Sequence, residues 1–322
     1  MSKWLALATA GVLAFGAAAC GDDDDSSTAS GGSGGGDLSG AVKIDGSSTV
    51  GPFAQTAAEQ FQGENPEVQI SVGTSGTGGG FEKFCAGETD ISDASRPIKE
   101  DEEVPICKRN GISYQEIQVA NDGIAIVTNK DLAIDCLTTE QLKKLWNTGS
   151  KITNYSQLDP KLPDVDVSLY GPGTDSGTFD FFTDEINGEE GVTRKDYQPS
   201  EDDNILVQGV SGDEGGLGYF GFSYYEQNQD ELNLVGVDAG DGCVKPSIEA
   251  IQDGTYTPLA RPIFMYPSEQ ALGSKPQVKA FMEYTIDNAD QVATAAQIVP
   301  LTAAQVDKAR QQLQEAEAKA GK

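Results

Sequence analysis

The sequence of 322 residues contains no histidine and only five cysteines. Without histidine a Ser-His-Asp triad is impossible, and the clusters of aspartate and histidine that serve a metal-dependent phosphatase are absent. Basic residues are also scarce, since 22 lysines and arginines stand against 51 aspartates and glutamates, which gives a formal net charge of −29. Nucleic acid is therefore not an expected partner, because its binding depends on contacts between basic residues and phosphates.

Residues 1–19 have the pattern of an export signal peptide. Lys3 supplies the positive start, and the apolar run over residues 5–19 is too short to span a bilayer as a helix. Small residues lead into Cys20, as in a lipoprotein signal, after whose cleavage the cysteine carries the lipid. A leucine is more usual than Ala17 three residues before that cysteine, and an ordinary secretory signal that is cut nearby is the alternative.

Residues 20–40 contain four consecutive aspartates, followed by serine, threonine and glycine, and no aromatic residue. Such a segment cannot bury apolar surface, so we expect a flexible, lipid-anchored tether rather than a metal site. The folded part then runs from about Ala41 to the C-terminus. That length is large for one core and sufficient for two lobes.

Four cysteines remain after Cys20, and an even number in an exported protein suggests disulfides. Their spacing does not match a zinc site. Three pairings are possible. We favour Cys85–Cys107, which closes a short local loop, together with Cys136–Cys243, which would tie distant parts of one lobe together.

From Ala41 onward, short β-rich runs alternate with helical patterns, which predicts an α/β protein with largely parallel sheets. Thr138 or Thr139 is the expected cap of a helix over residues 139–146. The other expected helices are residues 52–62, 79–86, 176–186, 276–288 and 303–320. The expected strands are residues 42–44, 68–72, 114–120, 124–128, 167–170, 217–220, 233–237 and 262–265.

Three segments share one design, in which a strand is followed by a turn rich in glycine and hydroxyl residues and then by a helix. They are residues 45–52, 73–80 and 171–178. The unpaired N–H groups and positive dipole end of a helix N-terminus attract an anion, and glycine lets the backbone approach it. One such segment is explained by ordinary capping, but three in one chain favour an oxyanion site. None has the lysine of a P-loop, so nucleotide binding is not expected.

A fourth segment, residues 90–98, carries a cation. Arg96 precedes a proline, so it lies in an extended stretch from which its guanidinium can reach a bound oxyanion. The competing interpretation is a surface arginine that is paired with one of the many carboxylates.

At these motifs the sequence resembles the phosphate-binding proteins of high-affinity ABC-type phosphate importers, over nearly all of residues 41–300. The resemblance implies a type II-like periplasmic-binding-protein fold, in which two α/β lobes joined by a hinge close on phosphate like a clam shell. Lobe 1 would comprise residues 41–120 plus 260–322, and lobe 2 residues 121–259. The hinge crossings would fall near residues 120–123 and 257–261.

The same resemblance assigns the phosphate ligands by motif. Ser48, Thr49 and the amide of Val50 resemble the first anion loop, and Thr77 matches the hydroxyl residue before the paired glycines. The loop of the other lobe is matched by Asp175, Ser176, Gly177 and Thr178.

Two departures from the family pattern concern charge. Many relatives carry an aspartate at the position of Arg96, where it accepts a proton from bound phosphate and so excludes sulfate. Those relatives also carry an arginine just before the Ser-Gly-Thr loop, where this chain has Pro172 and Gly173. We therefore expect that the cation has moved between lobes, with Arg96 as the cation of the site. Asp175 and Asp45 are the candidates for the proton-accepting carboxylate.

The resemblance implies a monomeric protein, lipid-anchored on the extracytoplasmic face of the cell membrane, at the cell surface or in a periplasm. It would capture inorganic phosphate and deliver it to ABC permease subunits, without catalysis, cofactor or metal. Three alternatives stay open: a binding protein for another oxyanion (sulfate, molybdate or phosphonate), a hydrolase-type phosphatase, and a surface adhesin or structural lipoprotein that keeps the fold.

Overall fold

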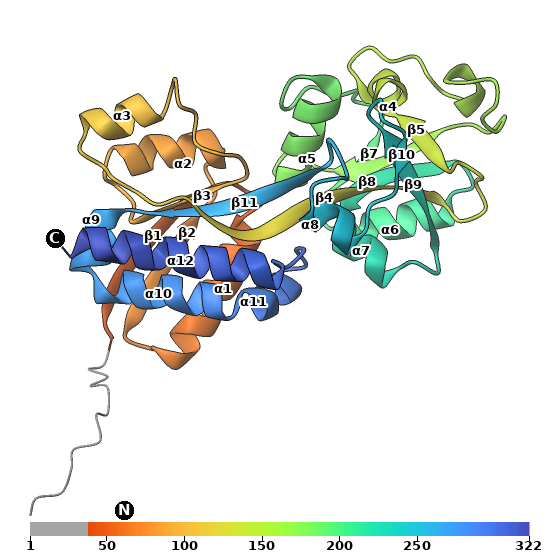
Figure 1. Cartoon of the computed structure of the whole chain (residues 1–322). Coiled ribbons are helices and arrows are strands. Elements are labelled where there is room, and N and C mark those ends of the chain that lie inside the picture. The colour runs from red at the N-terminus through yellow and green to blue at the C-terminus, as the bar shows by residue number, and fades with distance from the viewer. Residues whose placement is uncertain (1–37, 322) are drawn as a thin grey trace, which may run out of the picture. The chain divides into compact units, whose positions relative to one another are not determined.

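A computed structural model describes residues 38–321 of the chain (Figure 1). The predicted signal peptide, Cys20 and almost all of the predicted tether lie outside the described residues. None of the helices within residues 38–321 combines the length and the apolar character that a membrane crossing requires.

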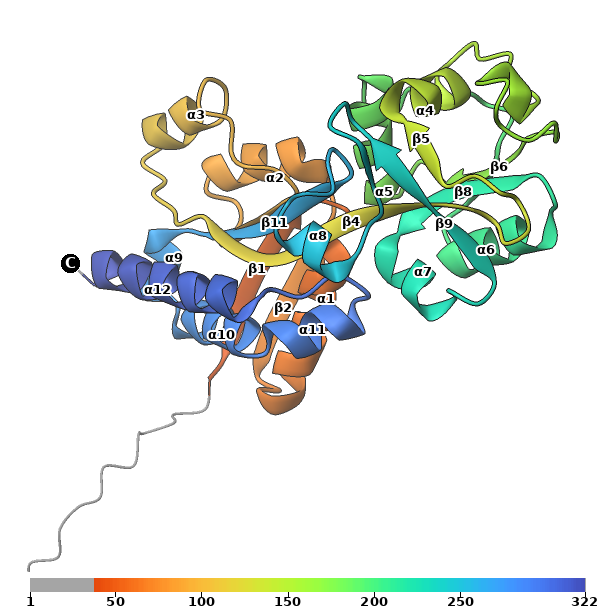
Figure 2. The ribbon, with the colours of Figure 1, turned by 45° about the vertical axis from the view of Figure 1, so that its right-hand side comes forward.

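The first lobe contains a sheet in which β1 pairs in parallel with β2 on one side and with β3 on the other. Helices cover both faces of this sheet (Figures 1 and 2). The larger core is built around Phe53, Phe61 and Phe281, and a smaller core around Phe81 and Phe84. The strands are β1 (Gly40–Gly46), β2 (Val68–Gly73) and β3 (Ile91–Ala94). The larger core is covered by α1 (Gly51–Glu64), α9 (Glu269–Ser274), α10 (Pro276–Asp287), α11 (Ala289–Ala295) and α12 (Ala303–Ala320), and the smaller by α2 (Gly76–Cys85) and α3 (Val104–Arg109).

Two long strands, β4 (Ile117–Asn129) and β11 (Ala260–Pro267), run antiparallel to each other and connect the lobes (Figure 2). The prediction of separate strands at 114–120 and 124–128 was wrong, because the polar residues between them find partners in segments distant in the sequence. Asn121 donates through its side chain to the Pro300 carbonyl, and Asp122 pairs with Arg261. These strands also make the sheets mixed rather than largely parallel.

The second lobe is built on the far part of β4, which pairs antiparallel with β8 and β9. Its core includes Trp146, Phe182 and Tyr219, with the rings of Phe182 and Tyr219 stacked 3.8 Å apart. The remaining strands are β5 (Cys136–Thr138), β6 (Ser168–Pro172), β7 (Gln198–Ser200), β8 (Gly216–Gly221), β9 (Leu232–Asp238) and β10 (Cys243–Val244). The helices are α4 (Thr139–Trp146), α5 (Gly177–Phe182), α6 (Asp203–Gly212), α7 (Phe222–Gln227) and α8 (Ile248–Gln252), with short turns η1 (Tyr155–Gln157) and η2 (Thr183–Asn187).

Helix ends follow the predictions best where a capping residue is present. α4 begins after Thr138, whose hydroxyl accepts the Gln141 N–H at 3.1 Å, and α12 has the predicted bounds. The helix predicted over residues 176–186 is shorter, because α5 ends at Phe182 and passes into the π-helical turn η2.

Two disulfides are present in the structure, and they are the favoured pairs. Cys85 at the end of α2 is joined to Cys107 in α3. Cys136 in β5 is joined to Cys243 in β10, and both strands flank β9.

Candidate functional site

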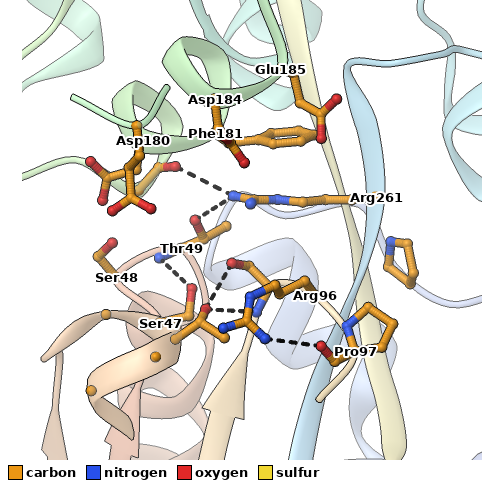
Figure 3. Close-up of a pocket in the computed structure, with 18 of the residues that line it drawn as sticks. Ser47, Ser48, Thr49, Arg96, Pro97, Asp180, Phe181, Asp184, Glu185 and Arg261 are labelled. Atoms are coloured by element: carbon orange, nitrogen blue, oxygen red, sulfur yellow. Dashed lines mark hydrogen bonds between the residues drawn. The ribbon is translucent and has the colours of Figure 1, made fainter. Parts of the chain in front are cut away.

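A cavity of about 640 Å³ brings together segments from both lobes (Figure 3). Its wall on the first lobe consists of the turn before α1, the start of α2 and the segment that follows β3. Its wall on the second lobe consists of α5 and η2, and β11 closes the remaining side. The lining residues are Ser47–Thr49, Ser75–Gly79, Ser95–Pro97, Lys99, Gly177, Asp180, Phe181, Asp184, Glu185, Glu190, Pro258 and Ala260–Pro262.

The turn before α1 lines this cavity with Ser47, Ser48 and Thr49. Ser47 anchors the turn, because its N–H donates to the Asp93 carbonyl and its hydroxyl accepts the Thr49 N–H at 3.2 Å. The N–H groups of Ser48 and Val50 have no acceptor within residues 38–321, and no side chain caps α1. Val50 is fully buried and lines neither cavity, so the assignment of its amide as a ligand stays a prediction.

The second predicted turn is held to the segment that contains the predicted cation. The Thr77 hydroxyl lies 3.0 Å from the Ser95 hydroxyl and accepts the Ser95 N–H at 3.2 Å. Thr77, Ser95 and Arg96 therefore line the cavity side by side.

Asp45 is not among the residues that line the cavity, because other groups occupy its carboxylate. Its Oδ1 accepts both the N–H and the hydroxyl of Ser75, and its Oδ2 pairs with Lys83. Burial would raise the pKa of Asp45, but the hydrogen bonds from Lys83 and Ser75 outweigh it and hold the pKa below its usual value. Asp45 fixes the second turn and does not face the ligand.

Arg96 both borders the cavity and is paired with a carboxylate, so each of the two interpretations of Arg96 in the sequence is met in part. It lines the cavity, and its guanidinium is also held by both oxygens of Glu103, at 2.9 and 2.7 Å. The hydrogen bond with Glu103 raises the pKa of Arg96 above its usual value.

The third predicted turn touches the first one directly. A Cβ on Gly177 would lie 2.2 Å from the Thr49 hydroxyl oxygen and 2.8 Å from that of Ser48, so only glycine fits. Ser176 caps α5 by accepting the Thr178 N–H at 3.2 Å. Asp175, Ser176 and Thr178 face away from the larger cavity and line a second one of about 380 Å³, which Ser48, Thr49 and Gly177 also border.

Sequence reasoning missed Arg261, which is the cation at the junction of the lobes. Its Nη2 donates to the Thr49 hydroxyl at 2.7 Å (Figure 3) and to the Gly177 carbonyl at 3.3 Å. Its Nε donates to Asp122 at 3.2 Å. The guanidinium lies 3.7 Å over the Phe181 ring, and burial lowers its pKa from the usual value. A signal was present, because residues 261–263 repeat the Arg-Pro-Ile of residues 96–98.

Sequence reasoning also missed the carboxylates on the wall formed by α5 and η2. Asp180, Asp184, Glu185 and Glu190 line the larger cavity. Burial and the charge of Glu190 raise the pKa of Asp180 to about 6, although Arg261 acts in the opposite direction. An acceptor therefore faces the hydroxyl and N–H donors across the cavity, an arrangement that suits an oxyanion that itself carries a proton.

The cations that line the larger cavity are all engaged by acidic side chains. Arg96, Lys99 and Arg261 are each paired with a carboxylate, so the attraction of the cavity for an anion depends on hydrogen-bond geometry. Within the described part of the chain, no group of three histidine, cysteine or acidic residues is arranged to hold a metal ion.

Comparisons with known proteins give similar chains over most of this sequence. A family model described as a PBP superfamily domain matches residues 27–289. The chain is 47% identical to Protein SphX of Synechococcus elongatus, over 81% of this chain and 78% of that protein. It is 41% identical to the phosphate-binding protein PstS of Staphylococcus saprophyticus, over 81% of each chain.

Solved structures agree with these relatives. A possible phosphate binding protein from Planctomyces limnophilus is 40% identical with a TM-score of 0.81, and the match covers 87% of this chain and 99% of that chain. A candidate phosphate ABC transporter substrate-binding protein with bound phosphate, from Clostridium perfringens, is 27% identical with a TM-score of 0.57, over 82% of this chain and 100% of that chain.

Proposed function

Because the chain belongs to the Pst-type phosphate-binding proteins of the PBP superfamily, we propose that it captures inorganic phosphate outside the cytoplasm and delivers it to the permease of an ABC importer. The observation that carries this proposal is the arrangement of the three glycine- and hydroxyl-rich turns. The first two line the larger cavity, and the third contributes Gly177 to it and lines the adjoining smaller cavity with its other residues. Two of these turns share a bond partner in the buried guanidinium of Arg261.

We assign the phosphate ligands to both lobes. On the first lobe they are the amides of Ser48 and Val50, the hydroxyls of Thr49 and Thr77, and Arg96. On the second lobe they are Gly177, which lines the larger cavity, and Asp175, Ser176 and Thr178 of the same turn, which line the adjoining smaller cavity. Phosphate has several oxygens, and donors from both sides of the cavity satisfy more of them than one turn alone. Arg261 joins this set as the buried cation between the lobes.

Asp180 is the carboxylate that we assign to anion selection. It lines the larger cavity and has a pKa of about 6, whereas Asp45 is occupied by Lys83 and Asp175 borders the smaller cavity. A carboxylate bonds favourably with an anion that donates a proton and repels one that has none. Phosphate carries a proton near neutral pH and sulfate does not, so this position favours phosphate.

The two lobes are proposed to close on the ligand about β4 and β11. Lobe 1 would consist of residues 41–120 plus 260–322 and lobe 2 of residues 121–259. This division is supported by the separate cores on either side of the point where Ala260 pairs with Gly123.

Attachment to the membrane is proposed to occur through a lipid on Cys20, with residues 21–40 as the tether. The small residues before Cys20 and the polar composition after it support this assignment. Mass spectrometry of the purified chain should show the lipid on Cys20 and its loss in Cys20→Ser. An unmodified Cys20 at the end of a retained signal, or cleavage elsewhere, would contradict the anchor.

Isothermal titration of the full chain with phosphate, sulfate and arsenate tests the binding function. We expect saturable heat with phosphate. The proposal fails if phosphate gives neither heat nor a thermal shift at millimolar concentration while another oxyanion does.

Hydrolysis of a chromogenic phosphate ester, in metal-supplemented and chelated samples, tests the proposed absence of catalysis, and robust turnover would contradict it.

A further inference from the structure

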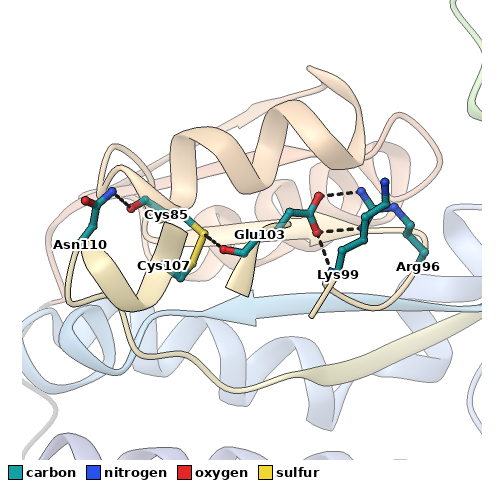
Figure 4. Close-up of a disulfide and its surroundings, with 6 residues drawn as sticks. All are labelled: Cys85, Arg96, Lys99, Glu103, Cys107 and Asn110. Atoms are coloured by element: carbon teal, nitrogen blue, oxygen red, sulfur yellow. Dashed lines mark hydrogen bonds and ion pairs between the residues drawn. A yellow bond between two sulfur atoms is a disulfide. The ribbon is translucent and has the colours of Figure 1, made fainter. Parts of the chain in front are cut away.

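The edge of the Arg96 guanidinium that is formed by Nη1 and Nη2 is held by Glu103 (Figure 4). Its Nη1 and Nη2 donate to the two oxygens of Glu103, and Nη1 also donates to the Pro97 carbonyl at 3.0 Å. An arginine has five N–H donors, so three are used. The Nε–H and the second N–H of Nη2 have no acceptor within residues 38–321.

These two remaining donors form a fork. In a planar guanidinium the Nε–H and the adjacent N–H of Nη2 are parallel, and their separation matches two oxygens of one oxyanion. Arg96 lines the larger cavity, and its Nη2 would lie 3.9 Å from a Cβ on Gly78, which lines the same cavity. Nη2, which carries one of the two free N–H groups, therefore lies beside the glycine-rich turn.

Glu103 is itself fixed and is not a loose counter-ion. Its side chain is 12% exposed, and its Oε2 also accepts the Lys99 N–H at 2.8 Å. The Cys85–Cys107 disulfide ties α2 to α3 directly after Glu103, and the Cys85 sulfur lies 3.7 Å from the Glu103 carbonyl oxygen. A ligand would have to break the bonds of the Glu103 carboxylate to Arg96 and to the Lys99 N–H to displace it.

We propose that Glu103 is a positioning residue for the oxyanion site, which holds Arg96 so that its free fork is ready for two oxygens of the bound anion. This inference rests on the proposed function, because it concerns how that site binds phosphate. A long side chain loses conformational entropy when a ligand fixes it, and Glu103 removes that cost before binding. The pair of Arg96 and Glu103 has no net charge, so it attracts an anion by the geometry of the free N–H groups. An unpaired arginine would attract chloride as well.

The first test measures the position of Arg96 without any ligand. The chain has five arginines, so the Nε–H signals of a ¹⁵N-labelled full chain are few, and Arg96→Lys identifies one of them. The heteronuclear NOE of the Arg96 Nε should approach that of the rigid backbone in the wild type and fall clearly in Glu103→Gln. Glu102→Gln is the matched control, since it removes the same charge from the neighbouring residue, which is exposed and bonds only Lys99. An Arg96 signal that is unchanged in Glu103→Gln would overturn the proposal.

The second test measures phosphate affinity by calorimetry. Glu103→Gln should lose about tenfold in affinity, as should Arg96→Lys, while Glu102→Gln stays within about twofold. The double variant should bind little worse than either single variant, because lysine has no fork to be positioned. If Glu103→Gln binds phosphate as tightly as the wild type or more tightly, Glu103 is a competitor or a bystander and the proposal is wrong.

The two tests separate this proposal from the proposed function. A wild type that binds no phosphate contradicts the function, and the NOE comparison still decides whether Glu103 holds Arg96. If the wild type binds phosphate and Glu103→Gln binds it with the same affinity, only the positioning role is contradicted. Thermal unfolding of each variant checks the fold, and Arg96→Lys gives a second variant in which α3 is untouched.

Discussion

Arg261 donates a hydrogen bond of 2.7 Å to the hydroxyl of Thr49, a residue 212 positions earlier in the chain. The same nitrogen lies 3.3 Å from the carbonyl oxygen of Gly177 in the other lobe. One guanidinium therefore ties the first anion turn to the turn of the second lobe. It does so from β11, one of the two strands that connect the lobes.

Arg261→Lys should lower phosphate affinity by between about tenfold and about one hundredfold. Hydrogen bonds to charged groups contribute roughly 1.5–3 kcal/mol, and lysine cannot bond Thr49, Gly177 and Asp122 at once. Calorimetry with phosphate measures the loss. Arg310→Lys is the control, because Arg310 is an exposed arginine of α12 that pairs with Asp287. Affinity within about threefold of the wild type would show that Arg261 does not serve the site.

Asp180→Asn should raise the affinity for sulfate by about tenfold or more and change phosphate affinity less. The variant removes a charge that faces the cavity, and a like charge at partly buried range opposes sulfate strongly. Titration with both anions gives the ratio of the two affinities. Asp184→Asn is the matched control, since Asp184 also lines the cavity. An equal shift in both variants would mean that overall charge, rather than Asp180, sets the selectivity.

The effect of Asp180 also has a defined direction with pH. Its pKa of about 6 means that lowering the pH from 7 to 5 protonates it and removes that negative charge. Sulfate keeps a constant charge over this range, so its affinity should rise as the pH falls through about 6. The rise should disappear in Asp180→Asn, and a rise that persists there would assign the titration to another group.

The fold was predictable where local signals are strong. The bounds of α4 and α12 follow from their capping residues and their uninterrupted helical patterns. α6 was missed because its glycines are poor helix formers, yet Gly209 is required there, since a Cβ would lie 2.3 Å from the Tyr170 ring. β4 was divided in two because Asn121 and Asp122 are typical of turns, and only contacts from distant segments satisfy them.

The candidate site likewise has a part that the sequence predicts and a part that depends on tertiary contacts. The turns that contain Thr49, Thr77 and Gly177 were found because glycine, hydroxyl residues and a following helix lie together in the sequence. The partners of the cations were not found, because the pairing of Arg96 with Glu103 and the position of Arg261 depend on tertiary contacts. A sequence shows that a guanidinium is available, and only packing shows which of its edges is free.

The two disulfides should contribute unequally to stability. A crosslink restricts the unfolded chain more when it closes a longer loop, and the two loops span 22 and 107 residues. Replacing both cysteines of a pair by serine should cost about 3 kcal/mol for Cys85–Cys107 and about 5 kcal/mol for Cys136–Cys243. Urea unfolding measures both values. Equal losses would show that strain or residual structure outweighs loop length.

Asp93 should make the protein less stable as the pH rises. Both of its carboxylate oxygens are buried without a partner, and burial followed by the charge of Asp45 raises its pKa well above the usual value. The folded state therefore keeps a proton that the unfolded state releases above about pH 4. Between these two pKa values the group costs about 1.4 kcal/mol of folding free energy per pH unit.

Asp93→Asn removes this titration and keeps the shape of the side chain. The variant should therefore be more stable than the wild type at pH 8, and the difference should shrink toward zero near pH 4. Urea unfolding at several pH values measures the two slopes, and Asp101→Asn, a change at an exposed aspartate of the same lobe, is the control. Parallel slopes in the wild type and Asp93→Asn would mean that Asp93 is ionised in the folded protein and that a partner satisfies it.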